Sequence, residues 1–190
     1  MIRIGIVGIG NVAAMFIQAI EYYKYSKESI GLIHEVIDGY RASDIKIVYA
    51  IDISKNKVGK DLSDAIFAKP NIVPKVIEVD RTGIVVRMGR VLDGVAEHMV
   101  NDFQPASLPE PTIDDIANEL RNYNVDVLVN LLPVGSASAS RFYAEAAARA
   151  NIAFVNCIPE FIASDGDYCK LFEENNALVL GDDIKGQLGS

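Results

Sequence analysis

Short apolar runs alternate with longer amphipathic segments along the whole chain, and this alternation restricts the folds that it can adopt. We predict strands at residues 3–7, 45–51, 125–131, 152–157 and 177–180, where β-branched and aliphatic residues gather. Helical spacing of apolar residues predicts helices at residues 12–23, 55–67, 136–150 and 167–175, with a further helix beginning at Thr112, where Thr-x-x-Asp is close to a capping box.

The connections between these elements are short, which favours parallel strands joined by crossover helices. The proline-rich residues 104–111 (QPASLPEP) predict a loop, and residues 71–90 predict an irregular stretch or one small extra strand. The expected fold class is therefore α/β, a Rossmann-like doubly wound parallel sheet with helices on both faces, in a single domain over residues 1–190.

Composition narrows the possible partners. The formal net charge is −8, which disfavours nucleic acid and anionic membranes, because both attract clusters of Lys and Arg. No apolar run approaches the roughly 20 residues that span a bilayer, so we expect a cytoplasmic protein. Two cysteines, Cys157 and Cys169, are too few for a disulfide framework and are expected to be reduced and structural. His34 and His98 lack metal-ligand spacing, so no metal site is predicted.

The turn after the first strand, GIGNVA at residues 8–13, has two physical interpretations. A glycine at position 8 permits a tight exit from the strand, Gly10 lets a phosphate approach the backbone, and Ala13 lets the helix pack closely. The N–H groups of Gly10, Asn11 and Val12 would then face a pyrophosphate. The alternative is a turn that only bends the chain.

Asp52 ends the second predicted strand, where an acidic residue binds the adenosine ribose and repels a 2′-phosphate. Its position favours NAD over NADP. The gap from the glycines is about twice the usual 20 or so residues, because of an insertion at residues 25–44. Asp52 could instead only cap a helix beginning near Ser54.

Two further clusters follow predicted strands, at the edge where ligands bind in open α/β sheets. In residues 130–136 (NLLPVGS), Ser136 could face a ligand, or could only cap the next helix. In residues 181–187 (GDDIKGQ), the side chains of Asp182, Asp183 and Lys185 suit a metal, a ribose or proton transfer, and equally an ordinary solvated turn.

Together these stretches resemble the actinobacterial and archaeal branch of the myo-inositol-1-phosphate synthases (inositol-3-phosphate synthases). The motifs that carry the resemblance occur in the family's order: GIGNVA at 8–13, KDLSDAIF at 60–67, VLDG at 91–94, LPVGS at 132–136, FVNCIPEFIASD at 154–165 and GDDIK at 181–185. The resemblance spans essentially the whole chain.

The resemblance implies an NAD-dependent isomerase that converts glucose 6-phosphate to inositol 1-phosphate, in inositol and phospholipid biosynthesis. The family oxidises C5, closes the ring by an intramolecular aldol step and returns the hydride. The implied dinucleotide contacts are Gly8, Gly10, Asn11, Val12 and Asp52. The loop beside the nicotinamide would contain Leu131, Pro133, Gly135 and Ser136, and the implied catalytic residues are Asp183 and Lys185.

Members of this family continue for nearly as many residues again and form homotetramers through that second region. We therefore expect residues 1–190 to be the NAD-binding part, without its catalytic region and inactive alone. Two alternatives remain open from the residues. A dehydrogenase of another Rossmann family would accumulate NADH, and an NAD-binding module without catalysis would bind the coenzyme only.

Overall fold

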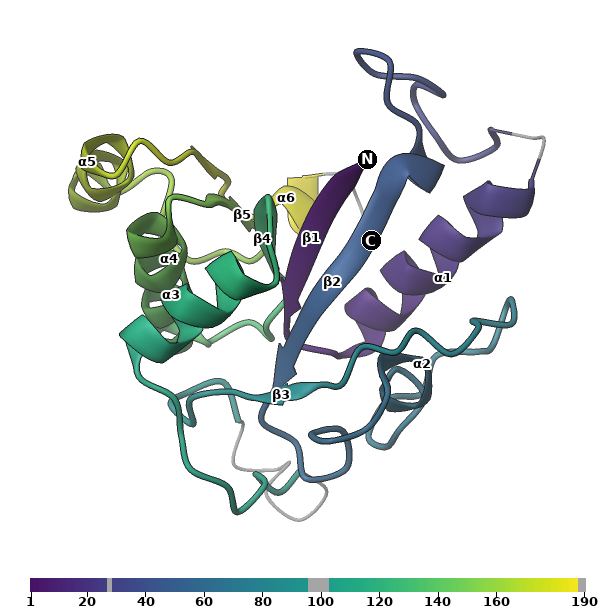
Figure 1. Cartoon of the computed structure of the whole chain (residues 1–190), viewed down its shortest axis with the longest axis horizontal. Coiled ribbons are helices and arrows are strands. Elements are labelled where there is room, and N and C mark those ends of the chain that lie inside the picture. Colours follow the sequence, from purple (N-terminus) through teal and green to yellow (C-terminus); the bar gives the residue numbers. More distant parts are fainter. Residues whose placement is uncertain (27–28, 96–102, 188–190) are drawn as a thin grey trace.

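The computed structural model of the chain describes residues 1–26, 29–95 and 103–187. Within these ranges the strands form one parallel six-stranded sheet in the order β3-β2-β1-β4-β5-β6 (Figure 1). Their bounds are Ile2–Val7 (β1), Ile45–Asp52 (β2), Arg87–Met88 (β3), Val127–Asn130 (β4), Ala153–Asn156 (β5) and Val179–Leu180 (β6). The strand order reverses between β1 and β4, which makes the gap between their carboxyl ends a topological switch point.

Helices cover both faces of this sheet, so the predicted Rossmann-like α/β fold is confirmed. Figure 1 shows α3 and α4 on one side of the sheet and α1 on the other. The helix bounds are Asn11–Tyr25 (α1), Leu62–Ala65 (α2), Ile113–Asn122 (α3), Ala137–Ala150 (α4), Gly166–Glu174 (α5) and Ile184–Gln187 (α6), with a 3-10 turn at Ala42–Asp44 (η1).

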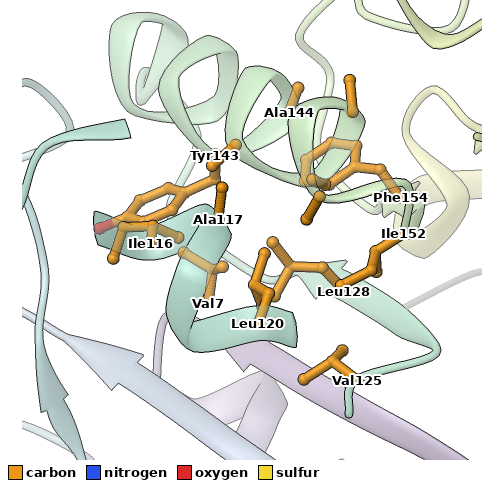
Figure 2. Packing of buried hydrophobic residues seen from close by; sticks show 14 of the residues in the cluster. Val7, Ile116, Ala117, Leu120, Val125, Leu128, Tyr143, Ala144, Ile152 and Phe154 are labelled. Carbon is orange, nitrogen blue, oxygen red and sulfur yellow. The ribbon is translucent and has the colours of Figure 1, made fainter. Parts of the chain in front are cut away.

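The alternation of side chains along β1 separates two hydrophobic clusters. Ile4 and Ile6 pack with α1 and α2 on one face, whereas Val7 packs with α3 and α4 on the other. Figure 2 shows the second cluster, in which Leu128 and Phe154 lie beneath the two helices. Each such fully buried aliphatic or aromatic side chain contributes about 1.5–3 kcal/mol, so the two clusters hold the sheet between its helices.

The predicted helix at residues 55–67 is wrong in extent. Only Leu62–Ala65 is helical, and Asp61 is its N-cap through a bond from the amide of Ser63. The backbone on both sides of the cap pairs with residues 84–86 instead: the amides of Gly59 and Leu62 donate to the carbonyls of Val86 and Ile84. A backbone that is committed to these lateral bonds cannot continue a helical ladder, despite its apolar stripe.

The structure confirms the predicted helix start at Thr112 and the small extra strand in residues 71–90. Thr112 caps α3 and forms a reciprocal capping box with Asp115, as the Thr-x-x-Asp pattern predicts. The small extra strand in residues 71–90 is β3. The turn of helix α6 was not predicted. His98 lies outside the described residues.

The described residues also provide three general findings. None of their helices has the length and apolarity needed to cross a membrane. They contain no cluster of three His, Cys, Asp or Glu side chains that could hold a metal ion. Both cysteines are free, with Cys157 buried and Cys169 exposed, so the latter is not part of the core.

Candidate functional site

A cavity of about 310 Å³ opens at the carboxyl edge of the sheet, around the switch point between β1 and β4. Most of the residues singled out from the sequence line it, although they come from four separate segments. These are Gly8, Gly10, Asn11, Val12, Asp52, Leu131, Pro133, Ser136 and Lys185. Gly135 and Asp183 are not among its lining residues in the described chain.

The glycine turn forms one wall of the cavity. Gly8 has φ of +87°, and a Cβ there would lie 3.0 Å from the carbonyl oxygen of Leu131, so the turn and the loop after β4 approach too closely for a side chain. Gly10 is the N-cap of α1, and a Cβ at Gly10 would meet nothing within 4 Å. The open space that a phosphate needs is therefore present beside Gly10.

The first amides of α1 have no acceptor in the described part of the chain. A helix leaves its first N–H groups unpaired, and the first backbone hydrogen bond of α1 runs from the amide of Ala14 to the carbonyl of Gly10. The N–H groups of Gly10, Asn11 and Val12 are therefore free to bind an anion. The side chain of Asn11 is already engaged, because its Oδ1 accepts the amide of Ile72 at 2.9 Å. This bond connects the start of α1 to the segment around Ile72.

Asp52 connects the second strand to the glycine turn. Its Oδ2 accepts the amide of Ile9 at 2.8 Å, and its Oδ1 accepts the amide of Ser54 at 2.8 Å. No helix begins at Ser54, so the alternative interpretation of Asp52 as a helix cap is wrong. The carboxylate thus connects the glycine turn to the turn at Ser54. Because each of its oxygens can accept more than one hydrogen bond, it can still accept one from a ligand in the cavity that it lines.

Lys57 and Asn71 lie behind the glycine turn, and the sequence analysis missed both. The ammonium of Lys57 is 2.7 Å from the carbonyl oxygen of Ile9, 2.9 Å from Asn71 Oδ1 and 3.8 Å from Asp52 Oδ2. Asn71 Nδ2 donates to the same Ile9 carbonyl at 3.1 Å. Burial lowers the pKa of Lys57, and Asp52 offsets part of this effect. Lys57 is only 2% exposed. Nothing in the sequence pattern distinguishes it from the exposed lysines beside it, so its burial could not be predicted.

The loop after β4 brings Ser136 to the cavity, but Ser136 does not cap α4 through its side chain. Its hydroxyl is buried and has no hydrogen-bond partner among the described residues. The capping function belongs to Asp93 of the VLDG motif, whose carboxylate accepts the amides of Ser138 at 2.6 Å and Ala139 at 3.0 Å. Burial raises the pKa of Asp93, but these two amides outweigh it and lower the pKa. The interpretation of Ser136 as a cap alone is wrong.

Gly94 and Tyr143 complete this side of the cavity. Gly94 lies so close to Ser136 that a Cβ there would overlap the hydroxyl, and its φ is +85°. Tyr143, from the second turn of α4, accepts the amide of Arg90 at 3.1 Å through its buried hydroxyl. Burial raises the pKa of Tyr143 well above its usual value, so it remains a neutral hydrogen-bonding group.

The three polar residues predicted near the end of the chain, Asp182, Asp183 and Lys185, lie in different environments. Lys185 lines the cavity. Asp182 does not face a ligand, because its carboxylate accepts bonds from Asn156 and from the amides of residues 162–164. Asp183 has φ of +56°, and its carboxylate lies against Gly186. The hypothesis of a paired carboxylate site at 182–183 is therefore not supported by the geometry.

A buried polar chain runs along the carboxyl ends of β4 and β5. Asn130 Nδ2 donates to Ser140 Oγ and to Asn156 Oδ1, both at 2.9 Å, and Asn156 in turn donates to Asp182 at 2.8 Å. Both asparagines are fully buried. Buried amides need hydrogen-bond partners. These bonds therefore hold the carboxyl ends of β4 and β5 to the segment at Asp182, which leads into Lys185.

The fold and the cavity define a Rossmann-like α/β protein whose cleft lies at the switch point of the sheet, between a glycine turn and a strand-terminal aspartate. No protein-family model matches the chain. The chain is 42% identical over 192 residues to the inositol-3-phosphate synthases of Mycolicibacterium smegmatis and Mycobacterium tuberculosis, and 42% identical over 194 residues to that of Corynebacterium glutamicum. These matches cover 100% of this chain and 52% of each relative.

Solved structures agree. The crystal structure of Ari2 superposes with a TM-score of 0.80 at 33% identity, over 96% of this chain and 52% of that one. A myo-inositol-1-phosphate synthase-related protein from Thermotoga maritima superposes with a TM-score of 0.73 at 25% identity, over 96% of this chain and 55% of that one. The chain therefore belongs to the inositol-3-phosphate synthase family and spans about half the length of the curated relatives that it matches.

Proposed function

We propose that this chain is the NAD-binding part of an enzyme that isomerises glucose 6-phosphate to inositol 1-phosphate, also named the 3-phosphate. Identity of 42% along the entire chain to synthases of that name supports the reaction. One structural observation carries the coenzyme assignment: the unpaired amides at the start of α1 face open space at Gly10, and the Asp52 carboxylate lies on the same cavity.

The residues present fit NAD. The amides of Gly10, Asn11 and Val12 would hold the diphosphate at the positive end of α1, and Gly8 gives the turn its shape. Asp52 would accept the adenosine ribose hydroxyls, which favours NAD over NADP. NAD, when bound, supplies a reversible hydride acceptor for the oxidation and the later reduction of the sugar.

The other end of the cavity would receive the nicotinamide and the sugar. Leu131, Pro133 and Ser136 would border the nicotinamide, with the unpartnered Ser136 hydroxyl available to bond a ligand. Gly135 gives the loop its φ of +92° rather than a contact. Lys185 lines this cavity. Asp183 would not contact the ligand but would support the segment that carries Lys185, since its carboxylate lies against Gly186.

Calorimetric titration with NAD tests the coenzyme assignment. We expect saturable binding of NAD and weaker binding of NADP, and a folded chain that binds neither would refute the proposal. Turnover requires preorganised positive groups for an oxyanion and a phosphate dianion. Of the three cationic side chains among the described residues that line the cavity, Lys57 is held by Ile9 and Asn71 and Arg90 is paired with Glu110, which leaves Lys185. We therefore expect the 190 residues alone to produce no inositol phosphate from glucose 6-phosphate.

The second candidate is a coenzyme-binding module without catalysis, which the free amides of α1 and the position of Asp52 on the cavity would support equally. A fusion or mixture with the second half of a curated relative distinguishes the two. Inositol phosphate formed without net NADH supports the isomerase, whereas net NADH with a hydroxylated substrate would indicate a dehydrogenase.

We further propose a cytoplasmic homotetramer for the complete enzyme.

A further inference from the structure

The peptide unit of Ile9, in the middle of the glycine turn, is held on both of its polar sides. Its N–H donates to Asp52, and its carbonyl accepts from Lys57 and from Asn71. The Ile9 side chain is fully buried as well. The residue that separates the two glycines is therefore fixed by a carboxylate on one side and by an ammonium and an amide on the other.

This grip determines where α1 begins. In a regular helix the carbonyl of Ile9 would accept the amide of Ala13, four residues later. Lys57 and Asn71 occupy that carbonyl, and the first helical bond runs from Ala14 to Gly10 instead. The Ala13 amide is therefore left without an acceptor in the described chain, in addition to the amides of residues 10–12, which the start of any helix leaves unpaired.

Lys57 also brings positive charge to the turn from behind. Its side chain is 3% exposed and lines the same cavity, so water screens its charge only weakly. Asp52 lies 3.8 Å away and compensates the charge, which permits burial of the ammonium.

We propose that Lys57 is a positioning residue for phosphate: it fixes the Ile9 carbonyl, so that the Ala13 amide stays free beside those of residues 10–12, and it places an ammonium, paired with Asp52, behind the turn. The ligand class is a nucleoside diphosphate. This inference rests on the proposed coenzyme function, because it explains how that same site prepares for the diphosphate.

The test compares ligands with and without phosphate on neutral variants of Lys57. Titrations of the full chain use NAD, ADP and adenosine, followed by calorimetry and by NMR shifts. In Lys57→Met we expect the affinity for NAD and ADP to fall by about tenfold or more, while the affinity for adenosine changes by less than about threefold. Lys60→Met, which removes an exposed lysine from the same loop, is the matched control and should leave all three affinities unchanged.

Lys57→Gln provides the second variant where Lys57→Met does not fold, because its amide still donates a hydrogen bond but carries no charge. A selective loss for ADP is again expected, but a smaller one than in Lys57→Met, because the hydrogen bond to the Ile9 carbonyl can be kept. Equal losses for ADP and adenosine would show that Lys57 only maintains the fold, and unchanged ADP binding would show that it does nothing for phosphate; either result overturns the inference. A wild-type chain that binds neither NAD nor ADP would refute the proposed function instead.

Discussion

Asp52 and Ile9 are 43 residues apart in sequence and are joined by a 2.8 Å hydrogen bond from the Ile9 amide to the Asp52 carboxylate. This bond fastens the end of β2 to the glycine turn, which follows β1. A carboxylate at this position therefore shapes the glycine turn, in addition to the ribose contact proposed above.

Asp52→Asn should weaken both the fold and coenzyme binding. An amide presents one oxygen in place of two, so either Ile9 or Ser54 loses its acceptor, and the free energy of unfolding should fall by about 1–3 kcal/mol. NAD titration should show a parallel loss of affinity. Asp126→Asn is the control, because Asp126 accepts the amide of Arg3 at the opposite edge of the sheet; it should leave NAD affinity unchanged. Equal NAD losses in both variants would contradict this assignment.

The two glycines of the turn should respond differently to alanine. Gly10→Ala meets open space at an ordinary φ of −87°, so the unfolding free energy should change by less than about 1 kcal/mol, yet the methyl group would occupy the phosphate position and weaken NAD binding. Gly8→Ala should destabilise the chain by about 1–3 kcal/mol, because φ is +87° and the Leu131 carbonyl is in the way. Denaturant unfolding and calorimetry measure both. A Gly10→Ala chain that binds NAD normally would place the diphosphate elsewhere.

Asp61 should make stability depend on acid pH. Burial raises the pKa of this carboxyl, but hydrogen bonds from Ser63 and Thr82 outweigh it and hold the pKa well below its usual value. The resulting stabilisation is complete above about pH 4, the pKa of an unfolded Asp, and is lost as the pH falls through the folded pKa.

Asp61→Asn should therefore lower the unfolding free energy by about 2–4 kcal/mol at pH 7, and the difference from wild type should shrink below about pH 4. Urea unfolding at a series of pH values measures this difference. Asp64→Asn, on an exposed position of α2, should change little at any pH. A difference for Asp61→Asn that stays constant down to pH 2 would argue against the pKa shift.

Asp93→Ala should loosen the cavity wall that contains Ser136. Loss of the cap on α4 should lower stability by about 1 kcal/mol and also reduce NAD affinity, because the capped amides lie directly after Ser136. Thr112→Ala removes a comparable cap from α3, away from the cavity, because the Thr112 hydroxyl accepts the first-turn amide of Asp115. It should lower the melting temperature and leave NAD affinity intact. If Asp93→Ala affects only the melting temperature, Asp93 has no part in shaping the site.

The two cysteines should differ in reactivity. Burial raises the pKa of Cys157 to about 11, although Lys185 opposes this, so at pH 8 only about one thiol in a thousand is ionised. Cys169 is exposed. Iodoacetamide at pH 8 followed by mass spectrometry should find the label on Cys169 and leave Cys157 unmodified until the chain is unfolded. Rapid labelling of native Cys157 would contradict its burial.

The sheet was predictable from the sequence because its strands are short apolar runs and their connections are short. The period of the apolar residues located α1, α4 and α5 to within a few residues, and the capping-box pattern located the start of α3. The same period failed at residues 55–61, where the amide of Lys55 donates to Gln104 and the backbone from Gly59 onward pairs with residues 84–86. An apolar stripe reports which side chains are buried, and it cannot report that the backbone donors are already used by a distant segment.

The site was predictable where backbone geometry demands a particular residue, as at Gly8 and Gly10. It was not predictable where one polar side chain serves another. Lys57 and Asn71 bind a carbonyl about 50 and 60 residues earlier, and Asp93 caps a helix that begins more than 40 residues later. Such pairings depend on tertiary contacts between segments, so neither spacing nor periodicity marks them.

The buried chain from Asn130 through Asn156 to Asp182 has a mechanical consequence. The segment that leads into Lys185 is tied by hydrogen bonds to β5 and, through Asn156, to β4, so displacing that lysine would require breaking hydrogen bonds of two fully buried asparagines. We therefore expect this end of the cleft to keep its shape when the cavity is filled.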